Sequence, residues 1–312
     1  MVESFISKDL LMSVGNSKIE TSLIVVELFD EKFTRFAKDF RDMLESTQTL
    51  QTLKLDSCEL SDTSIKQLED GLSLNETDVA LKLENKYTVN SAMKVTSQNL
   101  HEINVMQCIL SDENVSQLSN IVTKCKQLKV LKIRLEDNSE NFFRALSNNK
   151  SLRELSIQTT GKMSVLMFQT LPSTSITTLD LAIYKTEGLG NDGSLAFKEF
   201  IYRNKVLTVL KANWCGLTDE AFKGIIFTRE SPLRELSLMG NTEVDKGWTD
   251  LFNALCSSRI TTLDVRANRP YGEECCTALK CLLNSKNTIK IIANGRNEDV
   301  VCSIAAALAV TY

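Results

Sequence analysis

The sequence has little of the side-chain chemistry that most enzymes and metal sites use. Among its 312 residues there is one histidine, His101, and a catalytic triad or a histidine-ligated metal needs more partners than one imidazole. Nine cysteines occur, but no two have the C-x-x-C spacing that clamps zinc. We therefore predict no catalytic residue, no bound metal and no cofactor, and a protein that is not an enzyme.

An excess of one charge is also missing. Lysine and arginine total 36 against 40 acidic residues, which gives a formal net charge of -4 and a pI near 5.4. Neither value is typical of a protein that binds nucleic acid or an anionic membrane. We therefore expect no nucleic-acid partner and no membrane partner, and no motif indicates a small-molecule substrate.

Long apolar runs are absent as well. Residues 1–15 carry Glu3, Lys8 and Asp9 among their apolar side chains, which is unlike a secretory signal. The longest apolar stretch, residues 300–310, contains Ser303 and is shorter than the roughly 20 residues that span a bilayer. We expect a cytoplasmic protein whose cysteines are mostly free and buried thiols.

A repeated pattern runs through most of the chain. Residues 50–60, 100–110 and 207–217 share the form L-x-x-L-x-L-x-x-C-x-L, with other apolar residues at some leucine positions. Weaker copies begin at Leu23, Asp78, Leu128, Leu152, Ile176, Leu233, Ile260 and Lys286. These make about eleven repeats of about 26 residues, a period typical of leucine-rich repeats.

Each repeat predicts a strand followed by a helix. The L-x-x-L-x-L segment alternates apolar and polar residues, as a short strand with one buried face does. Apolar residues three or four apart predict helices over residues 112–122, 218–226, 247–255 and 273–284. We expect Thr218 and Asp245 to cap two of them, and Cys276 to face the core from the last.

With one strand and one helix per unit, the sequence resembles the ribonuclease-inhibitor type of leucine-rich repeat. The resemblance implies an α/β leucine-rich-repeat solenoid, a horseshoe with a parallel β-sheet on its concave side and α-helices on its convex side. We expect residues 1–20 to form an N-terminal capping segment, residues 21–296 the repeats, and residues 297–312 a C-terminal capping helix. Similar repeats occur in intracellular innate immune receptors and Ran-type GTPase-activating proteins.

Two features have structural interpretations. One position after the strand holds Cys58, Cys108, Cys215, Asn241, Asn268 and Asn294. A thiol or amide there can donate to backbone carbonyls of the turn. Residues 186–194 contain three glycines but lack the G-K-[ST] ending of a P-loop and open no convincing strand-to-helix unit, so we expect an irregular loop.

The predicted registers select a candidate binding surface. Alternate strand residues face opposite sides of a sheet, so the third, fifth and seventh residues of each repeat should lie on the concave face. Trp214 stands in the turn after such a strand, and exposed Trp, Met and Arg are frequent in interface hot spots. The predicted partner-binding residues are Lys132, Arg134, Lys211, Asn213, Trp214, Glu235, Met239, Asp264 and Arg266.

We therefore expect a protein-protein interaction scaffold, or a ligand-sensing or inhibitory module, that binds a macromolecular partner on its concave face and rim. Three alternatives stay open. One is a GTPase-activating regulator of a small GTPase, although no catalytic motif of the Ran-type family is matched. The others are the sensor end of a larger intracellular immune receptor and a bacterial effector.

Overall fold

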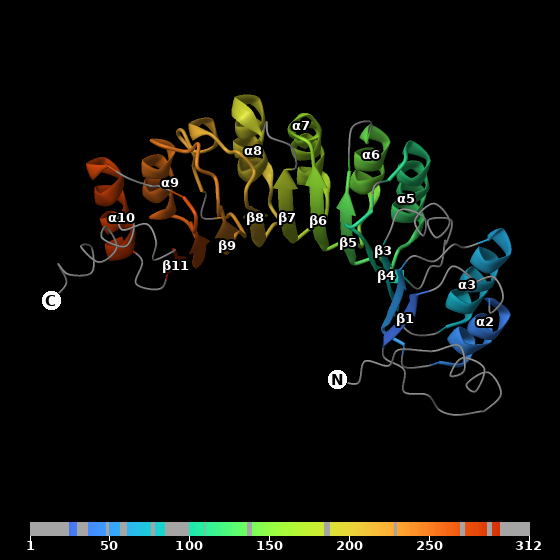
Figure 1. Cartoon of the computed structure of the whole chain (residues 1–312). Helices are drawn as coiled ribbons and strands as arrows, with labels where there is room; N and C mark the ends of the chain where they lie inside the picture. Colours follow the sequence, from blue (N-terminus) through green and yellow to red (C-terminus); the bar gives the residue numbers. More distant parts are fainter. Residues whose placement is uncertain are drawn as a thin grey trace. The chain divides into compact units, whose positions relative to one another are not determined.

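The computed structural model describes residues 25–29, 37–47, 50–56, 61–75, 79–84, 100–108, 110–135, 139–183, 188–227, 230–268, 272–285 and 289–293. The two predicted capping segments lie outside these ranges. The chain divides into two compact units, Met1–Leu155 and Ser156–Tyr312. In each unit most successive strands are separated in the sequence by a described helix, and the helices lie along one side of the strands (Figure 1).

The first unit contains five parallel strands among its described residues, each paired with the next in the sequence. These strands are β1 (Val25–Phe29), β2 (Thr52–Asp56), β3 (Val79–Glu84), β4 (Leu100–Val105) and β5 (Val130–Arg134). The helices are α2 (Ala37–Ser46), α3 (Asp62–Leu74), α5 (Asp112–Lys124) and α6 (Glu140–Asn148). Strand β6 (Glu154–Thr159) begins in this unit and ends in the second.

The second unit continues the same alternation. Its strands are β7 (Thr178–Ile183), β8 (Val209–Ala212), β9 (Glu235–Ser237), β10 (Thr262–Asp264) and β11 (Lys290–Ile292), again paired in parallel and in sequence order. The α-helices are α7 (Gly161–Thr170), α8 (Gly190–Arg203), α9 (Gly247–Leu255) and α10 (Glu273–Ser285). Two single-turn 3-10 helices are η2 (Leu171–Ser173) and η3 (Asp219–Ala221).

The registers of the pairs among β1 to β5 and among β7 to β10 confirm the predicted starts of these repeats. Even the degenerate copy at residue 78 is in the predicted register, because Thr52 pairs with Ala80. In the last repeat, however, Lys290 pairs with Thr262, two residues later than a copy beginning at Lys286 predicts. That copy carries lysine where leucine belongs, so its apolar pattern is too weak to define the register.

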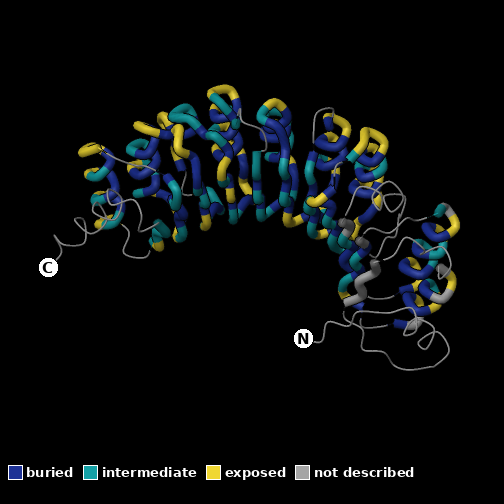
Figure 2. Tube along the Cα trace, viewed as in Figure 1, coloured by how far each residue is buried: buried dark blue, intermediate teal, exposed yellow. Residues whose placement is uncertain are grey.

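Burial follows the predicted alternation along the strands. In β5, Leu131 and Ile133 are fully buried while Val130, Lys132 and Arg134 are partly exposed. Figure 2 shows the same alternation of buried and intermediate residues along other strands. Fully burying a leucine or isoleucine side chain contributes about 1.5–3 kcal/mol. The repeated apolar positions therefore fix which side of the sheet the helices cover.

A row of aromatic rings lines the core between the helices and the sheet of the second unit. The ring centroids of Phe168 and Phe197 are 5.6 Å apart, those of Phe197 and Phe222 are 6.4 Å apart, and those of Phe222 and Trp248 are 5.9 Å apart. Trp248 is fully buried, and its indole N–H donates to the carbonyl of Val244 at 3.0 Å. Each ring comes from the next repeat, so the row ties four repeats together.

The helix predicted over residues 218–226 is wrong, since only the single turn η3 forms there. Gly224 has a φ of 64°, a left-handed conformation that does not continue a right-handed helix. The carboxylate of Asp219 instead accepts hydrogen bonds from the amides of Asp245 and Gly247, at 2.7 and 2.8 Å. The start of α9 is therefore capped from the preceding repeat rather than by the Asp245 side chain.

The glycine-rich segment is also different from the expected loop. Helix α8 begins at Gly190 and includes Gly193, so the segment does connect a strand to a helix. Gly188 has a φ of 55°, and a Cβ added there would lie 2.8 Å from the Cα of Gly216. Two turns of neighbouring repeats approach too closely at this point for a side chain, which accounts for both glycines.

The prediction that Cys276 faces the core from α10 is wrong. Cys275 is buried with Leu279 and Leu282, whereas Cys276 is only partly buried. Burial raises the pKa of the Cys275 thiol to about 12. The two adjacent cysteines are equally apolar, so the sequence could not distinguish them.

Cys215, Asn241 and Asn268, at the position after the strand, have the predicted structural role, because the side chain of each donates to backbone carbonyls; Cys58 and Asn294 lie outside the described residues. Asn241 is fully buried, and its amide nitrogen donates to the carbonyls of Ala212 and Leu238, at 2.8 and 2.9 Å. Its side-chain oxygen accepts from the amides of Cys215 and Leu217, both at 3.1 Å. One side chain thus satisfies four backbone groups in two successive repeats.

A second row of buried polar residues lies at the helix ends, where the sequence had not suggested one. Asn75, Cys125, Asn149 and Asn204 each follow the last residue of a helix. The amide nitrogen of Asn149 donates at 2.6 Å to the carbonyl of Val122 in the preceding repeat. Polar links at both ends of the repeat complete an α/β leucine-rich-repeat solenoid.

Candidate protein-binding surface

Seven of the nine predicted partner-binding residues lie on strands β8 to β10 and the turns that follow them. We call the side of the sheet opposite the helices the strand face. Lys211 and Glu235 are exposed on it, and Asn213 and Met239 are partly exposed in the turns. The other two predicted residues, Lys132 and Arg134, lie on β5 in the first unit.

The turn after each of these strands has an unusual backbone conformation. Trp214, Gly240 and Ala267 occupy the same position in three successive repeats, with φ values of 56°, 75° and 54°. The amide of Trp214 donates to the carbonyl of Met239 at 2.7 Å, and the amide of Gly240 donates to that of Arg266 at 3.0 Å. A left-handed conformation costs a residue other than glycine about 1–2 kcal/mol. The ladder between repeats holds Trp214 in this conformation.

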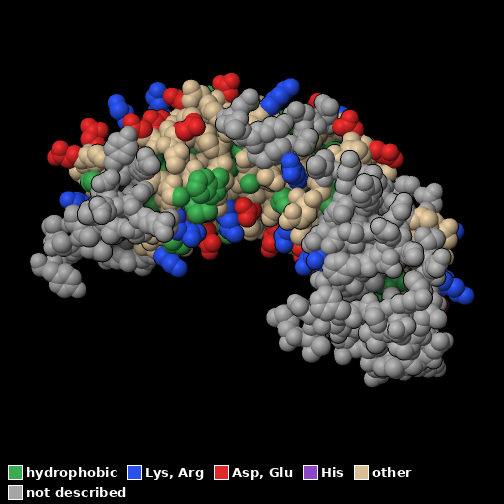
Figure 3. All heavy atoms as spheres, in the orientation of Figure 1, with side chains coloured by type: hydrophobic (Ala, Val, Ile, Leu, Met, Phe, Trp, Pro, Cys, Tyr) green, Lys and Arg blue, Asp and Glu red, His purple; other side chains and the backbone are tan. Residues whose placement is uncertain are grey.

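The indole of Trp214 lies against the backbone of the next repeat. A Cβ added to Gly240 would approach the indole carbons Cδ2, Cε3 and Cε2 to between 2.3 and 2.6 Å. Trp214 nevertheless remains 58% exposed. In Figure 3 a hydrophobic patch lies over the strands of the second unit, with basic and acidic side chains beside it. The ring therefore has one supported face and one available to a partner.

Asn213 connects the residues around the tryptophan. Its side-chain oxygen accepts hydrogen bonds from the Ser237 hydroxyl at 2.8 Å and from the amide of Met239 at 2.9 Å. The ammonium group of Lys211 lies 3.9 Å from the carboxylate of Asp180. An ion pair at an exposed site contributes little to stability. Asn213 thus has a positioning role in addition to its predicted role as a contact.

Arg266 and Asp264 form a fixed ion pair on β10 and its turn. The guanidinium Nη2 lies 2.6 Å from one carboxylate oxygen, and Nε lies 2.9 Å from the other. Burial favours the neutral form of Asp264, but the hydrogen bonds and charge of Arg266 outweigh it, and the Asp264 pKa lies below its usual value. Asp264 is 7% exposed, so Arg266 covers it. A partner would meet the arginine and not the aspartate.

The basic residue Lys132 on β5 has a partner within the chain as well. Its ammonium lies 3.0 Å from the Glu102 carboxylate on the neighbouring strand. Cross-strand pairs of opposite charge stabilise a sheet by roughly 0.2–1 kcal/mol. Lys132 is therefore partly neutralised on the strand face of the first unit.

No protein-family model matches the chain. Similar solved structures include the complex of Rad7 and Elc1 in yeast, at 16% sequence identity and a TM-score of 0.46, covering 89% of this chain and 79% of that chain. Another is the complex of TLR13 with the single-stranded RNA ssRNA13, at 18% identity and a TM-score of 0.46, covering 84% of this chain and 38% of that chain.

The second comparison corrects one prediction. We excluded nucleic acid as a partner from the balanced charge of the sequence, whereas the similar TLR13 structure contains single-stranded RNA. Overall charge describes the whole chain, and a binding surface uses only a few of its residues. A net charge of -4 therefore does not exclude a nucleic-acid partner.

One residue that matters for this surface was missed from the sequence. Gly240 supports the indole of Trp214, because any larger residue would occupy the space of the ring. The sequence indicates the role of Gly240 only by its position, because it stands in the same turn as Trp214, one repeat later. That position suggests a role only when the left-handed conformation of the turn is known.

Proposed function

We propose that the chain is a protein-binding module whose contact surface is centred on Trp214. The observation that carries the proposal is an exposed indole on a left-handed backbone. Folding does not require an aromatic residue in this turn, since Gly240 and Ala267 fill the same position in the next two repeats. A partner that covers the ring would bury a large apolar group already held in place, so little ordering cost accompanies binding.

Charged and polar groups around the indole support a specific contact. Arg266 is oriented by its carboxylate partner, and Met239 lies in the adjacent turn. Trp and Arg are the residues most enriched in hot spots, where truncation of one side chain costs 2 kcal/mol or more. Lys211, Asn213 and Glu235 extend the proposed surface along the strands, and Lys132 and Arg134 are proposed contacts of the first unit.

Four finer assignments belong to the same proposal. Full helices such as α3, α5 and α8 support the ribonuclease-inhibitor type of repeat. Four buried free thiols, at Cys108, Cys125, Cys215 and Cys275, support a reducing, cytoplasmic location. We propose that binding itself is the activity, without catalysis, and we include innate-immune sensing because a sensor also acts by binding.

Among the described residues no helix is both long and apolar enough to cross a membrane.

The test is affinity capture with the wild type, Trp214→Ala, Gly240→Ala and a control, followed by affinity measurement with the purified partner. Tyr202→Ala is the control, because Tyr202 on α8 is 56% exposed and so matches Trp214. We expect Trp214→Ala to weaken binding about 30-fold, which corresponds to roughly 2 kcal/mol. Gly240→Ala should weaken it too, by displacing the indole without removing a contact.

Circular dichroism spectra must first show that all variants keep the wild-type fold. A partner retained by both Trp214→Ala and Gly240→Ala would contradict the proposed surface. Capture that is abolished by nuclease treatment would identify a nucleic acid rather than a protein, and would contradict the proposed class of partner. If Tyr202→Ala on α8 weakened binding as much as Trp214→Ala, the contact with the partner would not be specific to the strand face.

A further inference from the structure

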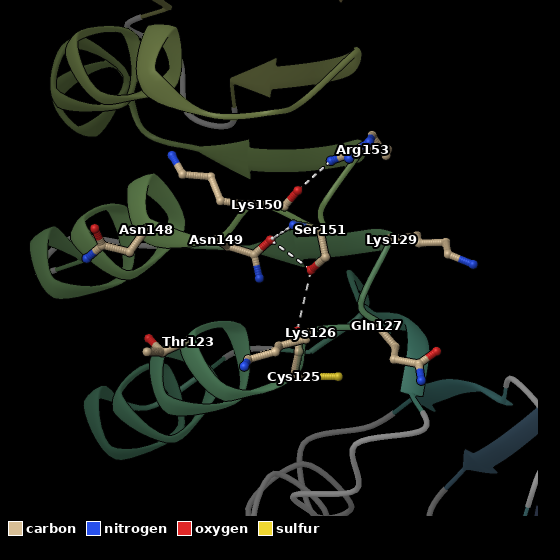
Figure 4. Close-up of a pocket in the computed structure, with 10 residues that line it drawn as sticks. All are labelled: Thr123, Cys125, Lys126, Gln127, Lys129, Asn148, Asn149, Lys150, Ser151 and Arg153. Atoms are coloured by element: carbon tan, nitrogen blue, oxygen red, sulfur yellow. Dashed lines mark hydrogen bonds between the residues drawn. The ribbon is translucent and has the colours of Figure 1, made fainter.

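A hollow of about 570 Å³ lies in the first unit, between the turns that follow helices α5 and α6. The two turns are adjacent, because the amide of Arg153 donates to the carbonyl of Lys129 at 2.8 Å. A longer contact of 3.5 Å joins the Ser151 hydroxyl to the carbonyl of Cys125. The residues that line the hollow are drawn in Figure 4. It is separate from the surface proposed around Trp214, which lies in the second unit.

The lining of the hollow is strongly basic. Lys126, Lys129, Lys150 and Arg153 all line it, and all four are exposed. No aspartate or glutamate occurs among the described residues that line it. Elsewhere on the same unit the Lys132 ammonium lies 3.0 Å from the Glu102 carboxylate. Basic and acidic side chains are therefore mixed on that part of the surface, unlike in the hollow.

The repeat explains how four cations come together. Residues 126–129 read Lys-Gln-Leu-Lys and residues 150–153 read Lys-Ser-Leu-Arg, each directly after the buried C-cap residue of a helix. Equivalent residues of successive repeats lie side by side, so a basic residue at two positions in two repeats gives an array of four. After Asn204, in contrast, the same two positions hold Lys205 and Thr208.

The floor of the hollow is well ordered by hydrogen bonds. The side-chain oxygen of Asn149 accepts from the amides of Ser151 and Leu152, at 2.9 and 2.7 Å. One guanidinium nitrogen of Arg153 donates to the carbonyl of Lys150 at 2.8 Å, and the Lys150 ammonium donates to that of Ser147 at 3.3 Å. The bonds from Arg153 and Lys150 hold two of the four positive charges in place before any ligand arrives.

We propose that this hollow binds an acidic segment of a polypeptide, with several aspartate or glutamate side chains facing the four cations. Its volume falls within the range of ligand sites, about 300–1,000 Å³, and exceeds what one small anion fills. No aromatic ring occurs among the described lining residues, whereas single-stranded nucleic acids are usually held by stacking on such rings. A run of carboxylates matches both the charge and the size.

The test uses a fluorescein-labelled octaglutamate peptide and fluorescence anisotropy, at low ionic strength and again at about 0.15 M. The variant is Lys126→Glu with Lys150→Glu. The matched control is Lys205→Glu with Lys246→Glu, which changes the net charge equally. Lys205 follows Asn204 as Lys150 follows Asn149, and its ammonium also donates to a helix carbonyl, that of Tyr202 at 3.3 Å.

We expect the peptide to bind the wild type and the control alike, and the pocket variant at least about tenfold more weakly at low ionic strength. Equal weakening in variant and control would show a general charge effect and overturn the site. Absence of binding to the wild type would also overturn it. Tighter binding of a single-stranded RNA of equal charge, lost in the same variant, would assign the hollow to nucleic acid instead. None of these results affects the surface around Trp214.

Discussion

Substituting Asn241 by alanine tests whether the buried asparagines hold successive repeats together. The change removes four hydrogen bonds to backbone groups of two repeats. A buried hydrogen bond contributes about 1 kcal/mol, and a group left without a partner costs more. We therefore expect the free energy of unfolding to fall by roughly 4 kcal/mol, a large part of the 5–15 kcal/mol typical of folded proteins.

The assay is urea unfolding followed by far-UV circular dichroism, combined with amide hydrogen exchange. The amides of Cys215 and Leu217 donate to Asn241, so their protection should fall more than that of amides in other repeats. Asn241→Cys should lose less than alanine, because Cys215 serves at the equivalent position and its thiol lies 3.5 Å from the carbonyl of Leu181. Asn253→Ala, on the exposed side of α9, is the control and should change stability by less than about 0.5 kcal/mol.

A loss below about 1 kcal/mol for Asn241→Ala would refute this reasoning. It would mean that water reaches the turn carbonyls once the amide is gone, and that the asparagine is not needed to satisfy them. Unchanged exchange at Cys215 and Leu217 would lead to the same conclusion from the donor side.

Two further predictions concern the same turns. Ala267→Gly should raise the free energy of unfolding by about 0.5–1 kcal/mol, measured by urea titration. Glycine removes the cost of the left-handed φ, about 1–2 kcal/mol, but adds about 0.5–1 kcal/mol of unfolded-chain entropy. A loss of stability would contradict this. The pKa of Asp264 is lower in the folded protein than in the unfolded chain, where it lies near 4. The ion pair with Arg266 therefore stabilises the fold fully above about pH 4, and this contribution is lost as the pH falls through the folded-state pKa. In acid unfolding the stability difference between wild type and Arg266→Gln should therefore shrink below about pH 4, and a difference independent of pH would rule the ion pair out.

The strands were predictable because each repeat places several large apolar residues at fixed spacing. Leu207, Leu210 and Ala212 are all buried, and shifting their strand by one residue would expose that whole face. Where the pattern loses its leucines, at Lys286, the predicted register was two residues out. Register therefore depended on apolar side chains rather than on repeat length.

Helices were predictable in position but less so in detail. The segment that follows Thr218 has the apolar spacing of a helix, yet the left-handed Gly224 limits it to a single turn. Cys275 and Cys276 are chemically equal, and only the packing of α10 decides which is buried. Sequence spacing constrains a helix face to within about one residue, and tertiary contacts decide the rest.

The candidate surface was predicted residue by residue, but not as an arrangement. Lys211 and Arg266 were selected from strand alternation, and Trp214 was selected because a tryptophan in the turn after a strand has the composition of an interface hot spot. That Arg266 covers Asp264 and that Gly240 supports the indole are contacts between side chains and turns. Such contacts depend on backbone angles that a repeat pattern does not specify. The basic hollow of the first unit was overlooked because its lysines lie in turns and not on the predicted face.

The two tryptophans of this chain give it two optical probes with separate surroundings. Trp248 is enclosed by phenylalanine rings, so its emission should stay at short wavelength until the repeat that contains α9 opens. Trp214 is exposed to water, and its emission should shift to shorter wavelength when another molecule covers it. Replacing either one with phenylalanine would let fluorescence follow unfolding and occupancy of the surface as independent signals, without any added dye.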